Sequence, residues 1–279
     1  DRSFLTLSPD MACITSMDAD HLDIYGDASE LKKSFEDFSK KVKSSGKLFV
    51  RNGLPLKGIT YGIEDNSDYS IQNIKIKNGT YVFDVRTPKT VLENFQFNLP
   101  GRHNLSNALI ALAMAVEYGC PYRQLAKALA SYKGVKRRFT YHIKTENFVF
   151  IDDYAHHPEE INAVYQAVRE MYPGKKILAI FQPHLFSRTR DFGDDFAKSL
   201  SQFDEVMLLD IYPARELPIA GITSEWLLKK IKNPNKQLTS KLELMQKIHE
   251  SKAQVLLTIG AGDIGEEVKH IKKEFSVAS

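Results

Sequence analysis

This 279-residue sequence has few cysteines, no long apolar run and little net charge. Its only cysteines, Cys13 and Cys120, are far apart and form no CxxC pair, which excludes a disulfide scaffold and favours a reduced cytosolic protein. No apolar run approaches the roughly 18 residues of a membrane helix and no signal peptide is evident, so we expect a soluble cytoplasmic protein. The net charge of +3, from 38 basic and 35 acidic residues, predicts no general binding to nucleic acid.

The sequence also lacks an initiator methionine and a phosphate-binding loop. It begins with Asp1 and reaches a strand-like segment at 11–15 almost at once, which predicts that it starts inside a domain. No GxxGK[ST] pattern, whose backbone amides and lysine would hold nucleotide phosphates, occurs in the 279 residues. We therefore expect the chain to be a piece of a longer protein.

The first half of the chain mixes helices with strands. Apolar residues at helical or alternating spacing carry these predictions, and Asn78-Gly79 suits the tight turn of a hairpin. The predicted helices are 28–45, 104–119 and 121–132. The predicted strands are 11–15, 47–51, 59–62, 69–76, 81–85 and 91–97.

The second half alternates strands and helices after Gly134. Its strands at 177–182 and 255–259 are apolar on both faces, as in a parallel sheet covered by helices. We therefore predict an α/β protein with two domains, 1–135 and 136–279, of which the second is doubly wound, mostly parallel and Rossmann-like. The predicted hairpin is 139–144 with 148–152. The other strand is 206–212, and the helices are 158–171, 189–203, 224–231, 241–251 and one from 264.

Two polar clusters in the first half are candidate site residues. Asp20-His21-Leu22-Asp23 follows a strand, where an imidazole between carboxylates could help hold a divalent cation, or where solvated residues could cap the next helix. Gly101-Arg102-His103-Asn104 opens an apolar helix that also carries Asn107. The Asn side chains could cap the helix, or they could pair with the hydrogen-bonding edge of adenine. From the residues alone, capping is the favoured role.

Three clusters in the second half contain basic residues or histidines. Lys136-Arg137-Arg138 lies at the predicted domain junction, where guanidinium groups could pair with phosphate or form a solvated linker. The segment 152–158 ends a strand, and its adjacent histidines lack the spacing of a helical zinc pair but could orient a carboxylate or amine. The segment 182–191 places His184, Arg188 and Arg190 at the start of a helix, which predicts an anion site.

A glycine pattern near the end of the chain requires a separate interpretation. Gly260-Ala261-Gly262-Asp263-Ile264-Gly265 fits the dinucleotide fingerprint GxGxxG between a strand and a helix. Only 14 residues follow it, so no second strand can supply the acidic residue that such sites place about 20 residues further on. We interpret it as a tight turn that joins the last strand to its helix. The turn could also face the substrate.

The order and spacing of these clusters resemble the Mur ligase family, the ATP-dependent amino-acid ligases of bacterial cell-wall synthesis. The likeness runs through nearly all 279 residues and is strongest at 152–158 and 182–190, which are similar to the member that adds L-alanine to UDP-N-acetylmuramate. The resemblance implies a three-domain enzyme that forms an acyl phosphate from ATP before the amine attacks. The chain departs from the family in lacking the phosphate loop and the UDP-binding domain, which implies a piece of the enzyme that is inactive alone.

By position, the resemblance implies a role for each candidate residue. His21 would be a ligand of Mg²⁺, Asn104 and Asn107 would contact adenine, and Arg138 and Asp153 would bind ATP. The catalytic residues would be His156, Arg188 and Arg190. The substrate contacts would be Tyr154 and His184.

Other functions remain open at this point. The nearest competitor is the family member that recycles murein tripeptide. A non-catalytic nucleotide- or sugar-phosphate-binding module, a dehydrogenase using the 260–265 turn, and a nucleic-acid-binding protein are weaker alternatives. The sequence leaves open the oligomeric state, the orientation of the domains, and a preference for L-alanine over glycine or L-serine.

Overall fold

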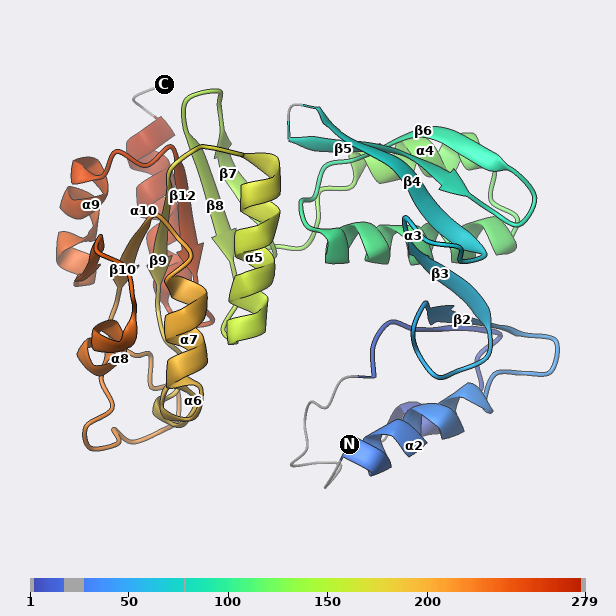
Figure 1. Ribbon diagram of the computed structural model, residues 1–279, viewed down its shortest axis with the longest axis horizontal. Helices are drawn as coiled ribbons and strands as arrows, with labels where there is room; N and C mark the ends of the chain where they lie inside the picture. Colours follow the sequence, from blue (N-terminus) through green and yellow to red (C-terminus); the bar gives the residue numbers. More distant parts are fainter. Residues whose placement is uncertain (1–2, 18–27, 78, 277–279) are drawn as a thin grey trace. The chain divides into compact units, whose positions relative to one another are not determined.

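The computed structural model describes residues 3–17, 28–77 and 79–276, and its elements are labelled in Figure 1. The chain forms two compact units, Asp1–Tyr132 and Lys133–Ser279. Each unit contains one six-stranded sheet with helices against it. The predicted α/β class is confirmed, and both sheets are mixed and mostly parallel.

The first unit has a sheet whose strands follow one another in chain order, β1 to β6. Strands β1 to β4 are parallel, whereas β4, β5 and β6 form an antiparallel meander. Its strands are β1 (Met11–Ile14), β2 (Lys47–Arg51), β3 (Ile59–Ile63), β4 (Tyr69–Lys77), β5 (Thr80–Arg86) and β6 (Val91–Phe97). Its helices are η1 (Ser3–Thr6), α2 (Ala28–Ser39), α3 (Arg102–Glu117) and α4 (Tyr122–Ser131).

Helix α3 packs against strands β3 and β4, and its apolar residues form much of the core of this unit. The rings of Tyr61 and Tyr69 are fully buried beneath it. At the end of α3, Glu117 accepts hydrogen bonds from the Tyr69 hydroxyl, at 2.5 Å, and from the Lys47 ammonium. This polar cluster joins the end of the helix to β2 and β4.

The second unit has the strand order β11-β10-β9-β12-β8-β7, so the last strand of the chain lies in the middle of the sheet. All neighbours are parallel except β7 and β8, which form the predicted hairpin. Its strands are β7 (Thr140–Lys144), β8 (Val149–Asp153), β9 (Ile177–Phe181), β10 (Glu205–Leu208), β11 (Lys236–Leu238) and β12 (Val255–Ile259). Its helices are α5 (Pro158–Met171), α6 (Phe186–Asp191), α7 (Gly193–Leu200), α8 (Ser224–Lys230), α9 (Lys241–Glu250) and α10 (Ile264–Ser276).

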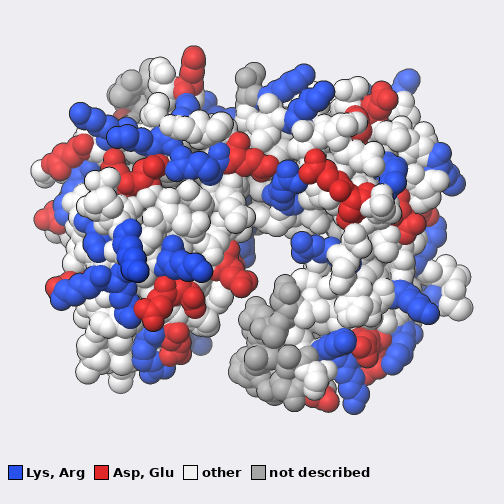
Figure 2. Space-filling model, in the orientation of Figure 1, with Lys and Arg blue, Asp and Glu red and all other residues white. Residues whose placement is uncertain are grey.

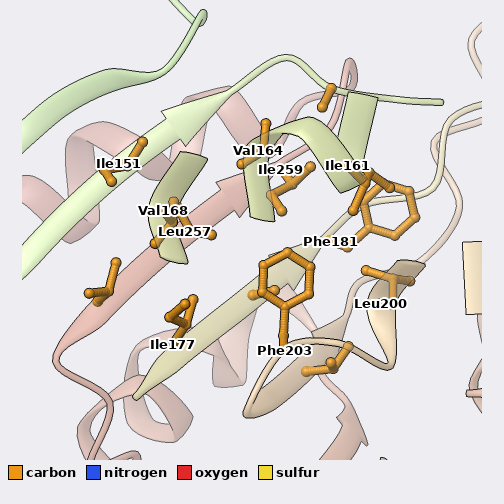
Figure 3. Packing of buried hydrophobic residues seen from close by; sticks show 14 of the residues in the cluster. Ile151, Ile161, Val164, Val168, Ile177, Phe181, Leu200, Phe203, Leu257 and Ile259 are labelled. Carbon is orange, nitrogen blue, oxygen red and sulfur yellow. The ribbon is translucent and has the colours of Figure 1, made fainter. Parts of the chain in front are cut away.

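Both faces of this sheet are covered, which explains the continuous apolar runs of β8, β9 and β12. Helices α5, α7 and α8 pack on one face, where Ile151, Leu257 and Phe181 meet side chains from the helices (Figure 3). Helices α9 and α10 pack on the other face. The carboxyl ends of the parallel strands therefore meet at one edge, and the predicted site residues of this unit follow them.

Two predicted helices and one predicted strand differ from the structure, and one strand was not predicted. The strand predicted over 206–212 ends at Leu208, as β10. The helix predicted over 189–203 is two helices, α6 and α7, separated at Phe192. Gly193, the first residue of α7, lies against the ring of Trp226, where a side chain would collide. The edge strand β11 was not predicted, because its three residues are mainly polar. Helix α2 ends at Ser39, and a turn in which Gly46 N–H donates to Lys43 O follows in place of the predicted last turns.

Candidate active site

Four rings form a row along the carboxyl edge of the sheet in the second unit. Tyr154 and His156 follow β8, His184 follows β9 and Tyr212 follows β10. Neighbouring ring centroids are 5.4 Å apart for Tyr154 and His156, 6.2 Å for His156 and His184, and 5.7 Å for His184 and Tyr212. The structure thus brings together three predicted site residues and adds Tyr212, which the sequence analysis missed.

The two histidines of the row have complementary hydrogen-bonding states. Nδ1 of His156 lies 3.0 Å from the carbonyl oxygen of Tyr154, which can only accept, so in its neutral form His156 has its hydrogen on Nδ1 and a free lone pair on Nε2. Nδ1 of His184 lies 3.3 Å from a guanidinium nitrogen of Arg188, which can only donate, so the hydrogen of neutral His184 is on Nε2. Burial, Arg188 and His156 all lower the pKa of His184, which favours this neutral form.

This pair can therefore offer one acceptor and one donor to the same ligand. An amine that must lose a proton would need the acceptor, Nε2 of His156. A carboxylate or phosphoryl oxygen would need the donor, Nε2 of His184, together with the guanidinium of Arg188. The arrangement fits a reactant that carries both an amine and an anionic group.

The two predicted arginines of α6 lie in different places. Arg188 contacts His184, whereas Arg190 pairs with Asp191 at 2.7 Å and its side chain is half exposed. Residues two apart on a helix do not share a face, which is why Arg190 does not join the row. At the start of α6 the carboxylate of Glu216 accepts hydrogen bonds from the N–H of Ser187, at 3.0 Å, and from its hydroxyl.

Those bonds to Ser187 lower the pKa of Glu216 and keep it charged. A carboxylate of the protein thus lies where the sequence predicted a substrate anion, and the sequence analysis did not single it out. Glu216 is far along the chain from Ser187, and no local pattern indicates that they meet.

Asp153, predicted to bind the cofactor, lies almost completely buried at the end of β8. Its two carboxylate oxygens accept hydrogen bonds from the backbone N–H groups of Phe139, at 2.6 Å, and Ala155, at 2.8 Å. Burial raises the pKa of Asp153 to about 6, and the two N–H groups partly oppose that rise. The geometry gives this carboxylate a structural role in joining the segment before β7 to the turn after β8.

The adjacent arginines before β7 have different surroundings. The side chain of Arg138 is 55% exposed and lies 3.5 Å from Glu160, so its guanidinium remains accessible to a ligand. Arg137 points inward, donates to the carbonyl oxygen of Gly260 at 2.6 Å and lies over the ring of Tyr154 at 4.9 Å. Of the two, only Arg138 was predicted as a site residue.

In the first unit, Asn104 and Asn107 lie near the start of α3, one turn apart. The amide of Asn104 donates to the carbonyl oxygen of Pro100 at 2.7 Å, and the N-terminal cap of α3 is Gly101, with no side-chain hydrogen bond. The capping role that the residues alone favoured is therefore wrong for Asn104. Asn107 is exposed on the helix surface.

The predicted metal ligand His21 lies outside the described residues. Within residues 3–17, 28–77 and 79–276, no three His, Cys, Asp or Glu side chains are grouped closely enough to hold a metal ion. In the same ranges no helix is long and apolar enough to cross a membrane. On the described part of the face in Figure 2, basic and acidic side chains are interspersed.

Comparisons with known proteins follow the same division of the chain. Residues 2–115 match the Mur ligase middle domain, and residues 137–265 match the domain described as Mur ligase, glutamate ligase domain. Proteins named UDP-N-acetylmuramate--L-alanine ligase are similar throughout, with 66% identity over 273 residues in Christiangramia forsetii and 64% over 274 residues in Flavobacterium psychrophilum. Each alignment covers 98% of this chain, and the chain spans 60% and 61% of the two relatives.

A solved structure is similar over the whole chain. The crystal structure of a UDP-N-acetylmuramate-alanine ligase from Thermotoga maritima aligns with 100% of this chain and 62% of its own, with a TM-score of 0.79 and 25% identity. Both units of the present chain therefore have counterparts in that protein.

Proposed function

The chain belongs to the Mur ligase family, and from this premise we propose that it is the larger part of a ligase that joins L-alanine to the lactyl carboxylate of UDP-N-acetylmuramate at the expense of ATP. The observation that carries the proposal is the high identity, over almost the entire chain, with curated relatives of that name. The chain spans about three fifths of those relatives, so the activity is proposed for the longer protein. The reaction would take place in the cytoplasm, where ATP and the amino acid are available.

The proposed reaction has two steps. The γ-phosphoryl group of ATP passes to an oxygen of the lactyl carboxylate, giving an acyl phosphate and ADP. The amine of L-alanine then attacks the acyl carbon, the bond from that carbon to the phosphate oxygen breaks, and phosphate leaves with the electron pair. Activation is needed because a free carboxylate has no good leaving group.

The row of rings supports roles in the second step. Nε2 of His156 would accept the proton that the attacking amine loses. Nε2 of His184 and the guanidinium of Arg188 would bind the carboxylate of the amino acid or the departing phosphate. Tyr154 would contact the substrate beside His156, and Arg190 remains a proposed catalytic residue that would have to turn away from Asp191 to take part.

Nucleotide binding is proposed for the remaining residues. The exposed guanidinium of Arg138 would bind ATP phosphates, and Asn104 and Asn107 would contact adenine. Asp153 would act near the nucleotide mainly by holding the backbone beside Arg138. Mg²⁺, proposed to be held with His21, would supply positive charge while phosphate moves.

The test uses a chimera in which these 279 residues replace the corresponding part of the Christiangramia forsetii relative. We expect release of ADP that requires both UDP-N-acetylmuramate and L-alanine. An inactive but folded chimera, measured beside an active unaltered relative, would contradict the proposal. ADP release by the 279 residues alone is measured in parallel, and we expect none because they lack a phosphate loop.

Arg188→Ala in the same chimera tests the role of the α6 arginine. We expect it to raise the KM for L-alanine and lower kcat, because the amino acid loses its charged partner. Arg123→Ala, which removes an exposed arginine from α4, is the matched control and should leave turnover unchanged. Full activity of the Arg188 variant would mean that this loop does not bind the reactants.

A further inference from the structure

The glycine turn between β12 and α10 contacts residues at both ends of the row of rings. It comprises Gly260 to Gly265, the segment that fits the dinucleotide fingerprint but that the proposed ligase chemistry leaves unused. In a dinucleotide site such glycines let the backbone approach a pyrophosphate. Here each of the three glycines is in close contact with a side chain or backbone atom of the protein itself.

Gly262 makes room for Tyr212 and Gln182. A Cβ on Gly262 would lie 2.3 Å from Oε1 of Gln182 and 2.7 Å from Cβ of Tyr212. Gln182 is also fixed by the turn, since its amide donates to Asp263 at 2.7 Å and accepts from the N–H of Ile264 at 2.9 Å. Tyr212 in turn stacks on His184 at an interplanar angle of 21°. The position of Gly262 therefore sets how close Tyr212 and His184 come to the sheet.

Gly265 makes room for Arg137 at the other end of the row. A Cβ on Gly265 would lie 2.8 Å from Cζ of Arg137. The same guanidinium donates to the carbonyl oxygen of Gly260 and lies over the ring of Tyr154. The backbone of Arg137 also accepts a hydrogen bond from the N–H of Tyr154, at 2.7 Å. Arg137 thus connects the glycine turn to Tyr154, and through Tyr154 to His156.

We propose that the glycine turn is a positioning element for the active site, in which Gly262 and Gly265 hold the two ends of the ring row through Tyr212 and Arg137. Side chains occupy the space beside these glycines that a pyrophosphate would need, so the turn is not a dinucleotide site. Arg137, Tyr212 and Gln182 are positioning residues, and none of them needs to touch a reactant. The catalytic part of the inference rests on the proposed function.

Gly265→Ala is the cleanest test. Gly265 lies in the first turn of α10, where alanine is favoured, and the new methyl group would meet only the far end of the flexible Arg137 side chain. The fold should persist while the guanidinium is displaced from Tyr154. In the chimera we expect kcat to fall on the order of 10- to 100-fold, since displacement of a reacting group by about 1 Å can cost about 100-fold.

The KM for ATP should stay within about twofold, because Arg138 and the first unit are unchanged. Partial unfolding would also lower the apparent kcat, so the unfolding midpoint of the variant in urea is measured alongside and should match that of the unaltered chimera. Glu266→Ala, at the exposed next position of α10, is the matched control and should keep normal turnover. Unchanged kcat in the Gly265 variant would overturn the inference.

A second measurement does not depend on catalysis. Ring-labelled histidine spectra of the 279-residue chain report on His156 and His184 directly. Gly262→Ala should shift the His184 signals most, and Gly265→Ala those of His156, because each variant displaces the neighbouring ring. Identical spectra in either variant, or binding of NAD to the unaltered chain, would overturn the inference. If the unaltered chimera is inactive, the proposed function fails and these spectra decide the positioning role alone.

Discussion

Asp153→Asn should destabilise the second unit, and the loss should grow as the pH falls from 7 to 4.5. Asparagine offers one acceptor oxygen in place of two, and its NH₂ group would face a backbone N–H of Phe139 or Ala155. A buried donor without a partner costs about 1–3 kcal/mol. That loss is present at every pH, because the amide does not titrate.

The dependence on pH comes from the raised pKa of the Asp153 carboxyl, about 6 in the folded chain because of burial. An unfolded aspartate has a pKa of about 3.9, so the difference is equivalent to ~3 kcal/mol. Between these two values the folded state binds one more proton than the unfolded state. Stability from this group is therefore fully present below pH ~4 and is lost as the pH rises through ~6. The asparagine variant lacks this gain on acidification.

Trp226 provides the assay. It is the only tryptophan and packs against the core of the second unit, so its fluorescence follows the unfolding of that unit in urea. The free energies of unfolding of wild type and variant are subtracted at each pH, which cancels the titration of all other groups. Asp210→Asn, at an exposed position after β10, is the control. If the difference in free energy of unfolding between wild type and Asp153→Asn stays constant or shrinks from pH 7 to 4.5, the reasoning is refuted.

Three further predictions follow from the same unit. Gly193→Ala should destabilise it by ~1–3 kcal/mol and shift the Trp226 emission, because the new methyl would lie 2.4 Å from Cη2 of that ring; unchanged emission would contradict the packing. His142→Leu should reduce the stability lost below pH ~6.5, since burial lowers the pKa of His142 and its Nε2 has no partner among the described residues; an unaltered pH profile in urea unfolding would count against it. Arg138→Ala in the chimera should raise the KM for ATP several-fold with little change in the unfolding midpoint, and an unchanged KM would remove Arg138 from the nucleotide site.

Much of the fold is predictable from the sequence because burial on both faces leaves a strong pattern. Strand β12 has the predicted bounds, and β8 and β9 lie within a residue or so of their predicted limits. The break between α6 and α7 was missed because it occupies a single residue, Phe192, within an otherwise helical pattern. Local pattern therefore predicts elements well where burial decides them, and it misses short breaks and a short polar edge strand.

The candidate site divides in the same way. His156 and His184 could be identified because both follow predicted strands in one sheet, whose carboxyl ends must meet. Tyr212 could not, and Arg137 was noted only as part of a basic cluster, because their importance comes from the rings and glycines they touch. The capping role favoured for Asn104 failed because its amide turns back to Pro100.

The central place of β12 has a consequence for synthesis of the protein on the ribosome. Strands β8 and β9 are made early, but they pair with β12 and not with each other. Until residues 255–259 have left the ribosome, the nascent unit lacks the middle of its sheet and exposes apolar strand edges. Premature termination between β9 and this strand would therefore leave the second unit without a complete sheet, and we expect such a product to aggregate.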